Sequence, residues 1–462
     1  MRQFLQITIT MKISPTLDTK FLPAVLWNRE FEKAASENGA PVTLGLLRDD
    51  KVVARRAVKI TADSDSSFRY IERMLKTMLW STGGNRILVA GPDSLVEQLQ
   101  NHYAESTVGK FDSQIIGEKI FNQPLSVEKC LKENIPEPVS DGQALGRHLD
   151  GCRIGFDLGG SDRKCAAVID GKVVFSEEIK WDPYFEKDPK YHYDGTMDSL
   201  NRAAAHLPRV DAIGGSAAGD YVDNEVRVAS LFRGVPEDLF ESEVRPIFEK
   251  LKQAWGGIPF DVVNDGEVTA LAGSMSLDDN AVLGISMGTS LAAGYVTPEG
   301  NITSWINELA FVPVDYRPNG PVDEWSGDVG CGVQFFSQQG VARLAPLAGI
   351  KFEQDTPFAE QLVEVQRLMA ENDPRARSIY ETIGTCFGYA IAHYATIYDF
   401  RNLLILGRVT SGEGGQIIIE KAEEVLNTEF PDLASKVSIS MPDEQMKRHG
   451  QAVAAASLPM IK

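Results

Sequence analysis

Two short turns of small residues stand out in this 462-residue chain because each joins two expected strands. The first turn carries Gly159, Gly160, Ser161 and Lys164. Adjacent glycines favour a turn with positive φ, and its bare backbone N–H groups can bind phosphate oxygens. Asp157, at the end of the preceding strand, suits a hydrated Mg²⁺, which takes few protein ligands. Taken alone, two adjacent glycines favour an ordinary glycine-rich hairpin with a solvated lysine.

The second turn, Gly288-Thr289, lies between expected strands at 281–287 and 291–296. Two such hairpins in successive units would hold one triphosphate from both sides of a cleft. The alternative for this turn alone is a small-residue packing turn. The first turn is not a P-loop, because the GxxxxGK[ST] pattern is absent, and it is not a dinucleotide-binding fingerprint, because a strand rather than a helix follows it.

Between the two turns, Asn264-Asp265 ends one expected strand and begins a helix. An aspartate in a cleft can take a proton from an attacking hydroxyl, and an amide beside it can fix the geometry of that hydroxyl. Asp265 taken alone is more typical of a helix N-cap.

A glycine-rich loop follows an apolar strand at 402–406 and opens a helix at 416–426. Its glycines include Gly407, Gly414 and Gly415. Such a loop lets a flat nucleobase lie against the backbone, although a plain strand-to-helix connection has the same composition.

The elements that position these residues alternate between strands and helices, which indicates α/β layers. Three strands at 153–157, 164–168 and 172–179 predict a meander. We expect three units: an N-terminal α/β region at 1–150, a first lobe at 151–260 and a second lobe at 261–462.

The residue pattern of the N-terminal unit predicts a hairpin at 43–60 with its turn at Asp49-Asp50, followed by a helix, a strand and a second helix. These expected elements cover 67–80, 86–91 and 94–103, after a weakly patterned stretch at 1–40, and residues 107–150 look like a polar connection. Asp49-Asp50-Lys51 echoes Asp170-Gly171-Lys172, 121 residues later. The region is therefore either a degenerate copy of the first lobe or a hairpin that is similar by chance.

Composition narrows the class of protein. Lys plus Arg number 46 against 65 Asp plus Glu, a net charge of −19, which argues against a non-specific nucleic-acid binder. The five cysteines form no CxxC pair, Met1–Thr8 has no signal-peptide pattern, and no stretch approaches the ~20 apolar residues of a membrane span. We expect a cytoplasmic protein. The sequence leaves open whether this protein forms a homo-oligomer.

These four sites, in this order, resemble the ROK sugar kinases of the actin-like, hexokinase and Hsp70 ATPase superfamily, over about residues 153–457. The resemblance implies a two-lobed actin-like (ribonuclease H-like) fold that closes around ATP–Mg²⁺ and a sugar. It implies that Asp265 is the catalytic base and that Glu308, with Asn264, binds sugar. The two turns then bind phosphate, with Asp157 reaching the magnesium ion through water. The loop at 407–415 then binds adenosine.

The chain departs from the family where its zinc motifs are expected. The family's Glu-x-Gly-His keeps its glutamate as Glu308, but the histidine is Phe311. The cysteine-rich run keeps only Cys331, and its terminal glutamate is Val333. A metal needs its full ligand set, so no structural zinc is expected. The loss of this glutamate removes one expected sugar contact. Either another side chain, such as Gln334 or His192, replaces that contact, or the substrate differs from glucose and does not need it.

Two functions fit the residues. The first is an ATP-dependent kinase that transfers the γ-phosphoryl group to a hydroxyl of a hexose or related sugar. The second is a non-catalytic nucleotide or sugar sensor that acts through protein partners. Repressors of the family carry a basic helix-turn-helix, and residues 1–150 show no such signature, so no nucleic-acid partner is expected.

Overall fold

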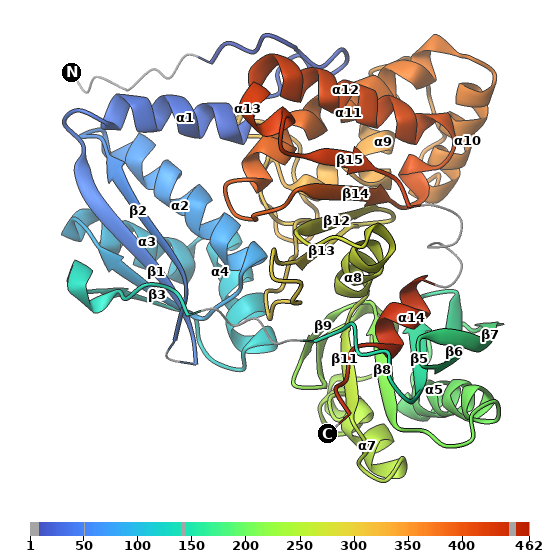
Figure 1. The fold of residues 1–462 in the computed structure, drawn as a ribbon. Coiled ribbons are helices and arrows are strands. Elements are labelled where there is room, and N and C mark those ends of the chain that lie inside the picture. The colour runs from blue at the N-terminus through green and yellow to red at the C-terminus, as the bar shows by residue number, and fades with distance from the viewer. Residues whose placement is uncertain (1–8, 50, 140–144, 443–449, 462) are drawn as a thin grey trace.

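Figure 1 shows the computed structural model of the chain, in which three regions are each built on one main β-sheet. The structure describes residues 9–49, 51–139, 145–442 and 450–461. The N-terminal segment Met1–Thr8 and Asp50 of the predicted hairpin turn lie outside the described residues. No helix in the described ranges is long and apolar enough to cross a bilayer.

Lobe I is a five-stranded sheet of order β11-β8-β5-β6-β7. Its main elements are β5 (Cys152–Leu158), β6 (Asp162–Ile169), β7 (Lys172–Lys180), α5 (Pro189–Ala204), β8 (Ala212–Ala217), α7 (Ile247–Ala254) and β11 (Phe260–Asn264). A two-stranded ribbon, β9 (Asp220–Val222) and β10 (Glu225–Val228), follows β8. The predicted meander is confirmed, because β5, β6 and β7 pair in sequence order and antiparallel.

The C-terminal helix α14 (Gln451–Ala456) returns to lobe I, where Figure 1 shows it against the sheet. Two glycines make this close approach feasible. A Cβ on Gly155 would lie 1.8 Å from the carbonyl oxygen of Ala452, and one on Gly214 1.7 Å from that of Ala455. The sequence division at residue 260 would separate β11 from its sheet. We therefore propose that lobe I ends at Asn264 and includes α14.

Lobe II has a four-stranded sheet of order β13-β12-β14-β15. Its elements are α8 (Asp265–Leu277), β12 (Val282–Met287), β13 (Leu291–Val296), α9 (Gln338–Leu344), α10 (Phe358–Ala370), α11 (Pro374–Tyr394), β14 (Asn402–Leu406), α12 (Glu413–Glu429), α13 (Pro431–Ala434) and β15 (Ser438–Ser440). Its hairpin and two parallel neighbours repeat the order and directions of β6-β5-β8-β11. The two lobes thus share one strand arrangement, and the predicted two-lobed α/β fold is confirmed.

The N-terminal region has a third sheet of order β2-β1-β3-β4. Its elements are α1 (Ala24–Ala35), β1 (Ala40–Arg48), β2 (Lys51–Ile60), α2 (Ser64–Ser81), β3 (Arg86–Ala90), α3 (Asp93–Glu105), α4 (Thr107–Asp112), a π-helix (Ser113–Ile120) and β4 (Ser126–Lys129). The hairpin, its helix, the next strand and the second helix are confirmed. The expectation that 107–150 only connects was wrong, because β4 completes the sheet beside β3. The weakly patterned start also contains α1.

The echo between the N-terminal region and lobe I extends only to a hairpin followed by a helix. In the N-terminal region the next strand, β3, pairs directly with β1. In lobe I the corresponding strand, β8, pairs with β5 instead, one strand further from β6. The chain thus builds two similar hairpins into sheets of different connectivity.

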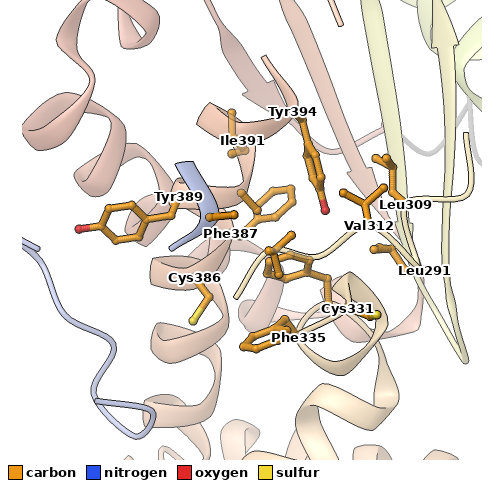
Figure 2. Close-up of a cluster of buried hydrophobic side chains, with 14 of the residues drawn as sticks. Leu291, Leu309, Val312, Cys331, Phe335, Cys386, Phe387, Tyr389, Ile391 and Tyr394 are labelled. Carbon is orange, nitrogen blue, oxygen red and sulfur yellow. The ribbon is translucent and has the colours of Figure 1, made fainter. Parts of the chain in front are cut away.

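The N-terminal region and lobe II share one hydrophobic core. It joins residues such as Tyr70 of α2 to the apolar face of α11 and to the segment 309–336. Figure 2 shows part of it, in which Cys331 and Phe335 belong to the same cluster as side chains of α11 such as Phe387. Lobe I has a core of its own. The N-terminal region is therefore packed as part of lobe II rather than as an independent arm.

Candidate active site between the lobes

The first glycine turn is a tight hairpin between β5 and β6. The Gly159 N–H donates to the carbonyl oxygen of Asp162 at 2.9 Å, and the Gly159 carbonyl accepts from the Trp181 indole at 2.7 Å. Neither Gly159 nor Gly160 has a positive φ, so that expectation was wrong. Gly160 is needed for space instead, because a Cβ there would lie 1.9 Å from the Tyr184 hydroxyl oxygen. Ser161 is exposed at the tip of the turn.

Asp157 and Lys164 face each other across this hairpin because β5 and β6 pair them in register. The Lys164 ammonium lies 3.8 Å from the Asp157 carboxylate, and the Ser216 hydroxyl donates to Asp157 at 2.6 Å. Burial raises the pKa of Asp157 in spite of both contacts. The pair thus offers a buried carboxylate and a cation beside the turn, as the sequence predicted.

Asn264, and not Asp265, caps helix α8. Its side-chain oxygen accepts the Gly266 N–H at 2.7 Å, and its side-chain amide donates to the Gly219 carbonyl at 2.7 Å. The N-cap role that Asp265 would have taken by itself is therefore filled. Asp265 lies where the chain crosses from lobe I to lobe II. Burial and, secondarily, the nearby Asp157 carboxylate raise the pKa of Asp265 to about 6.

Three carboxylates meet at this crossing: Asp265, Glu308 and Asp220. Burial raises the pKa of Asp220 to about 7. Burial, and then the charges of Asp220 and Asp265, raise the pKa of Glu308. The raised values mean that no cation in the described structure offsets these carboxylates fully. A group of unpaired, partly buried acids in a cleft is the arrangement that general-base chemistry needs.

A cavity of about 320 Å³ opens beside Asp220, the one of these three acids that lines it. Asp220 and Asn264 line it together with Glu267, a buried glutamate of α8. Burial raises the pKa of Glu267 to about 8, although the Asn307 amide donates to it. Arg48 of the N-terminal region forms part of the wall. The cavity therefore has polar groups of lobe I and α8 on one part of its wall and is bounded by all three regions.

The N-terminal region also holds Glu308 directly. The Glu308 N–H donates to the Trp80 carbonyl at 2.8 Å, and the Asn307 N–H donates to the Ser81 carbonyl at 2.9 Å. Both acceptors lie in the last turn of α2, whose carbonyl groups lack helical partners. The end of α2 thus fixes the backbone of a predicted sugar-binding residue.

The second turn and the glycine-rich loop meet at the ends of β12 and β14, which run parallel. Gly407 has φ 101°, and a Cβ there would lie 2.5 Å from the Met287 carbonyl oxygen, next to Gly288. Thr289 is exposed at the turn. A cavity of about 370 Å³, lined by Gly407 and Ser411 among others, lies at this loop.

Gly414 and Gly415 lie below that loop and are buried. A Cβ on Gly414 would lie 2.4 Å from the Tyr380 ring, and one on Gly415 2.2 Å from the Thr410 carbonyl oxygen. These glycines let α12 pack closely, so their contribution to the loop is to its shape.

Ion pairs and core packing hold the segment around Cys331 in place. Cys331 is buried in the shared core, and burial raises the pKa of its thiol (Figure 2). Asp328 bonds to Arg73 of α2 at 2.9 Å and lies 3.4 Å from Lys76. No group of three or more metal-ligating side chains occurs within the described ranges. Ion pairs to α2 hold this segment in place.

The two side chains considered as replacements for the lost glutamate are otherwise engaged. His192 is buried in lobe I, with its Nε2 within 3.1 Å of two backbone carbonyls. The Gln334 amide donates to Gln339 at 2.6 Å. Asp220, which the sequence reasoning missed, is the additional acid at the site. Its signal was its place three positions after the end of the buried strand β8, which runs parallel to β5, whose own end carries Asp157.

Comparison with solved structures identifies the fold of the larger part of this chain. No protein-family model and no curated protein matches the chain. Among solved structures, the ROK hexokinase from Thermus thermophilus matches with a TM-score of 0.52 and 18% identity, over 66% of this chain and 96% of its own. The larger part of this chain has the ROK fold.

A ROK-family transcriptional regulator, described as a homologue of the E. coli MLC protein, has the same fold. It matches with a TM-score of 0.54 and 19% identity, over 67% of this chain and 79% of its own. Each of the two matches covers about two thirds of this chain.

Proposed function

We propose that the chain is an ATP-dependent kinase that phosphorylates a hydroxyl of a hexose or related sugar. The observation that carries this proposal is the set of partly buried carboxylates at the crossing between the lobes. Asp265, with its pKa raised to about 6, is ionised at neutral pH and still basic enough to accept a proton. One structural neighbour, from Thermus thermophilus, is a ROK hexokinase, which is in keeping with this activity.

In this proposal Asp265 takes the proton of the attacking hydroxyl, and Glu308 and Asp220 bind neighbouring hydroxyls of the sugar. Asn264 holds the Gly219 carbonyl and so positions the strand that carries Asp220. Such positioning lets binding energy be used for the reaction geometry.

The phosphate chain of ATP would lie between the two turns, against the backbone of Gly159, Gly160, Gly288 and Thr289. Lys164 would offset the charge that develops on the phosphoryl group. Gly407 would lie at the adenosine, over a loop that Gly414 and Gly415 shape.

Asp157 fits a magnesium ion that keeps most of its waters, because it is one buried carboxylate at the turn rather than a cage of ligands. Bound Mg²⁺ would neutralise phosphate charge. The cytoplasm, where ATP is available, is the compartment that we propose.

A second candidate, a sensor that binds nucleotide or sugar without turnover, is favoured by one observation. The regulator that shares the ROK fold matches with a TM-score at least as high as that of the hexokinase. Both candidates predict ligand binding, and only the kinase predicts ADP release.

The test is ADP release by the full-length protein with ATP, Mg²⁺ and a panel of hexoses and amino sugars. We expect at least one acceptor to stimulate release, and we expect Asp265→Asn to lower kcat by about 10²–10⁴-fold with sugar binding retained. Asp278→Asn is the matched control, because Asp278 ends the same helix in the left-handed conformation that asparagine also adopts. No release with any acceptor, together with unimpaired sugar binding, would favour the sensor.

A further inference from the structure

A second cavity, of about 710 Å³, lies where the N-terminal region meets lobe II. One face of α1, the β1–β2 hairpin, α2 and the end of α11 with the residues that follow it form the walls. Its volume is within the range of small-molecule sites. None of the described residues that we assign to the turns or to the acceptor lines it. It is thus separate from the cleft.

Two residues that line this cavity, His393 and Asn28, carry buried polar atoms without hydrogen-bond partners within the described structure. His393 lines it, is only 3% exposed, and has no hydrogen-bond partner at either ring nitrogen within the described structure. Burial lowers the pKa of His393 to about 4, so the ring is neutral and offers one donor and one acceptor. Asn28 Oδ1 is a second buried atom without a partner in this part of the chain. Leaving such groups without hydrogen bonds destabilises the protein, and a polar ligand that bonds to them would recover this loss.

The charge around the cavity is opposite to that of the whole chain. Four cationic residues line it, namely Arg29, Arg56, Lys59 and Lys132. The one carboxylate among its lining residues, Glu32, already accepts the Tyr70 hydroxyl at 2.6 Å. A local excess of cations in a protein of net charge −19 favours an anionic ligand.

We propose that this cavity binds a small phosphorylated polyol, such as a sugar phosphate. The hydroxyls bond to the neutral His393 ring and to Asn28. The phosphate group lies against Arg56 and Lys59, because hydrogen bonds between charged groups are stronger than those between neutral groups. The two kinds of lining group, neutral polar and cationic, correspond to the two parts of such a ligand.

The test is calorimetric titration of the full-length protein with glucose 6-phosphate, ribose 5-phosphate and sorbitol 6-phosphate. We expect at least one to bind with a micromolar Kd, at least about tenfold more tightly than its unphosphorylated form and than inorganic phosphate. Equal binding of inorganic phosphate, or binding of none of the three, would overturn the proposal.

Variants locate the site. Lys59→Glu and His393→Phe should each weaken binding at least tenfold, and the exposed Lys59 keeps the test informative where the buried His393 variant folds poorly. Lys51→Glu is the matched control, because Lys51 is an exposed lysine of the same strand and does not line the cavity. Glu308→Gln should leave this binding unchanged. The reverse pattern, in which Glu308→Gln abolishes binding and Lys59→Glu does not, would assign the ligand to the cleft and refute the proposal.

Discussion

Two groups of buried acids in this protein have different surroundings. The acids at the crossing between the lobes, which we call the cleft carboxylates, are Asp157, Asp220, Asp265 and Glu308. The interface carboxylates Asp18 and Asp328 join lobe II to the N-terminal segment and to α2. Asp328 lies between Arg73 and Lys76, and Asp18 lies between Arg317 and Arg343 at 2.5 and 2.7 Å.

The pKa values move in opposite directions for the two groups. Burial raises the pKa of every cleft carboxylate, and the one nearby lysine does not reverse the effect at Asp157. Burial acts on Asp18 and Asp328 as well, but the paired guanidinium and ammonium groups outweigh it and lower the pKa. The buried acids that hold the structure together thus lie between two cations each, whereas the cleft carboxylates have at most one, the Lys164 ammonium beside Asp157.

The largest expected effect comes from breaking an interface pair. Asp328→Ala leaves Arg73 and Lys76 without one of their buried counter-charges and should lower the free energy of unfolding by about 3–5 kcal/mol. Urea denaturation at pH 7 measures this loss. Glu324→Ala, an exposed acid of the same segment, should stay within about 0.5 kcal/mol of the parent protein. A loss below about 1 kcal/mol for Asp328→Ala would mean that the pairing is not what holds the segment.

The activity of the proposed kinase should follow the ionisation of Asp265. Since the base must be deprotonated, kcat/KM should rise with pH and level off above the pKa of about 6. At pH 5 about a tenth of the base is ionised, which predicts a roughly tenfold lower kcat/KM than on the plateau. Initial rates between pH 5 and 8 at fixed Mg²⁺ measure the profile, and a flat profile would remove Asp265 from the base role.

Asp220→Asn separates acceptor binding from stability. It should raise the acceptor KM about tenfold, because a charged hydrogen bond to the sugar is lost. The KM for ATP should change less than twofold. Unlike Asp328→Ala, it should not lower the free energy of unfolding at pH 8, because it removes an unpaired charge. A fall in stability above about 1 kcal/mol would show that Asp220 is a structural acid.

The smallest effect concerns the pH dependence of stability. The folded cleft carboxylates keep protons between about pH 4 and 7, where the unfolded ones are ionised, so their contribution to stability falls as pH rises through this window. Asp18 and Asp328 act in the opposite direction, and their contribution is lost as pH falls below about 4. Asp220→Asn should therefore flatten the change between pH 5 and 8 by on the order of 1 kcal/mol. Equal slopes for the two proteins in urea titrations would contradict this assignment.

Local patterns in the sequence predicted much of the fold. The hairpins around Gly159 and Gly288 and the strand ending at Asn264 formed where expected, because turn glycines and short apolar runs carry local information. Long-range pairings were beyond such reasoning. The pairing of β3 with β1, the return of α14 to lobe I and the parallel addition of β4 each join segments whose sequences give no local sign of one another.

The candidate site shows the same division. Its order of Asp157, Asn264-Asp265 and Gly288 was readable because strand ends carry functional side chains in α/β proteins. The roles of Gly160 and Asn264 could not be predicted from the sequence. The role of Gly160 depends on the Tyr184 hydroxyl, and that of Asn264 on the Gly219 carbonyl. Asp220 is a member of the cleft group only because β8 runs parallel to β5.

The sequence by itself determined the two glycine turns, the acid between them and the absence of most zinc ligands, all of which depend on residue type and near spacing. Only the tertiary structure decided how the surplus N-terminal residues are used. They share a core with lobe II, bond to Glu308 through the end of α2, and pair with Asp328 in the segment where the family carries zinc. Those contacts join residues more than 200 positions apart. Their strength depends on burial, and whether a residue is buried cannot be read from a short stretch of sequence.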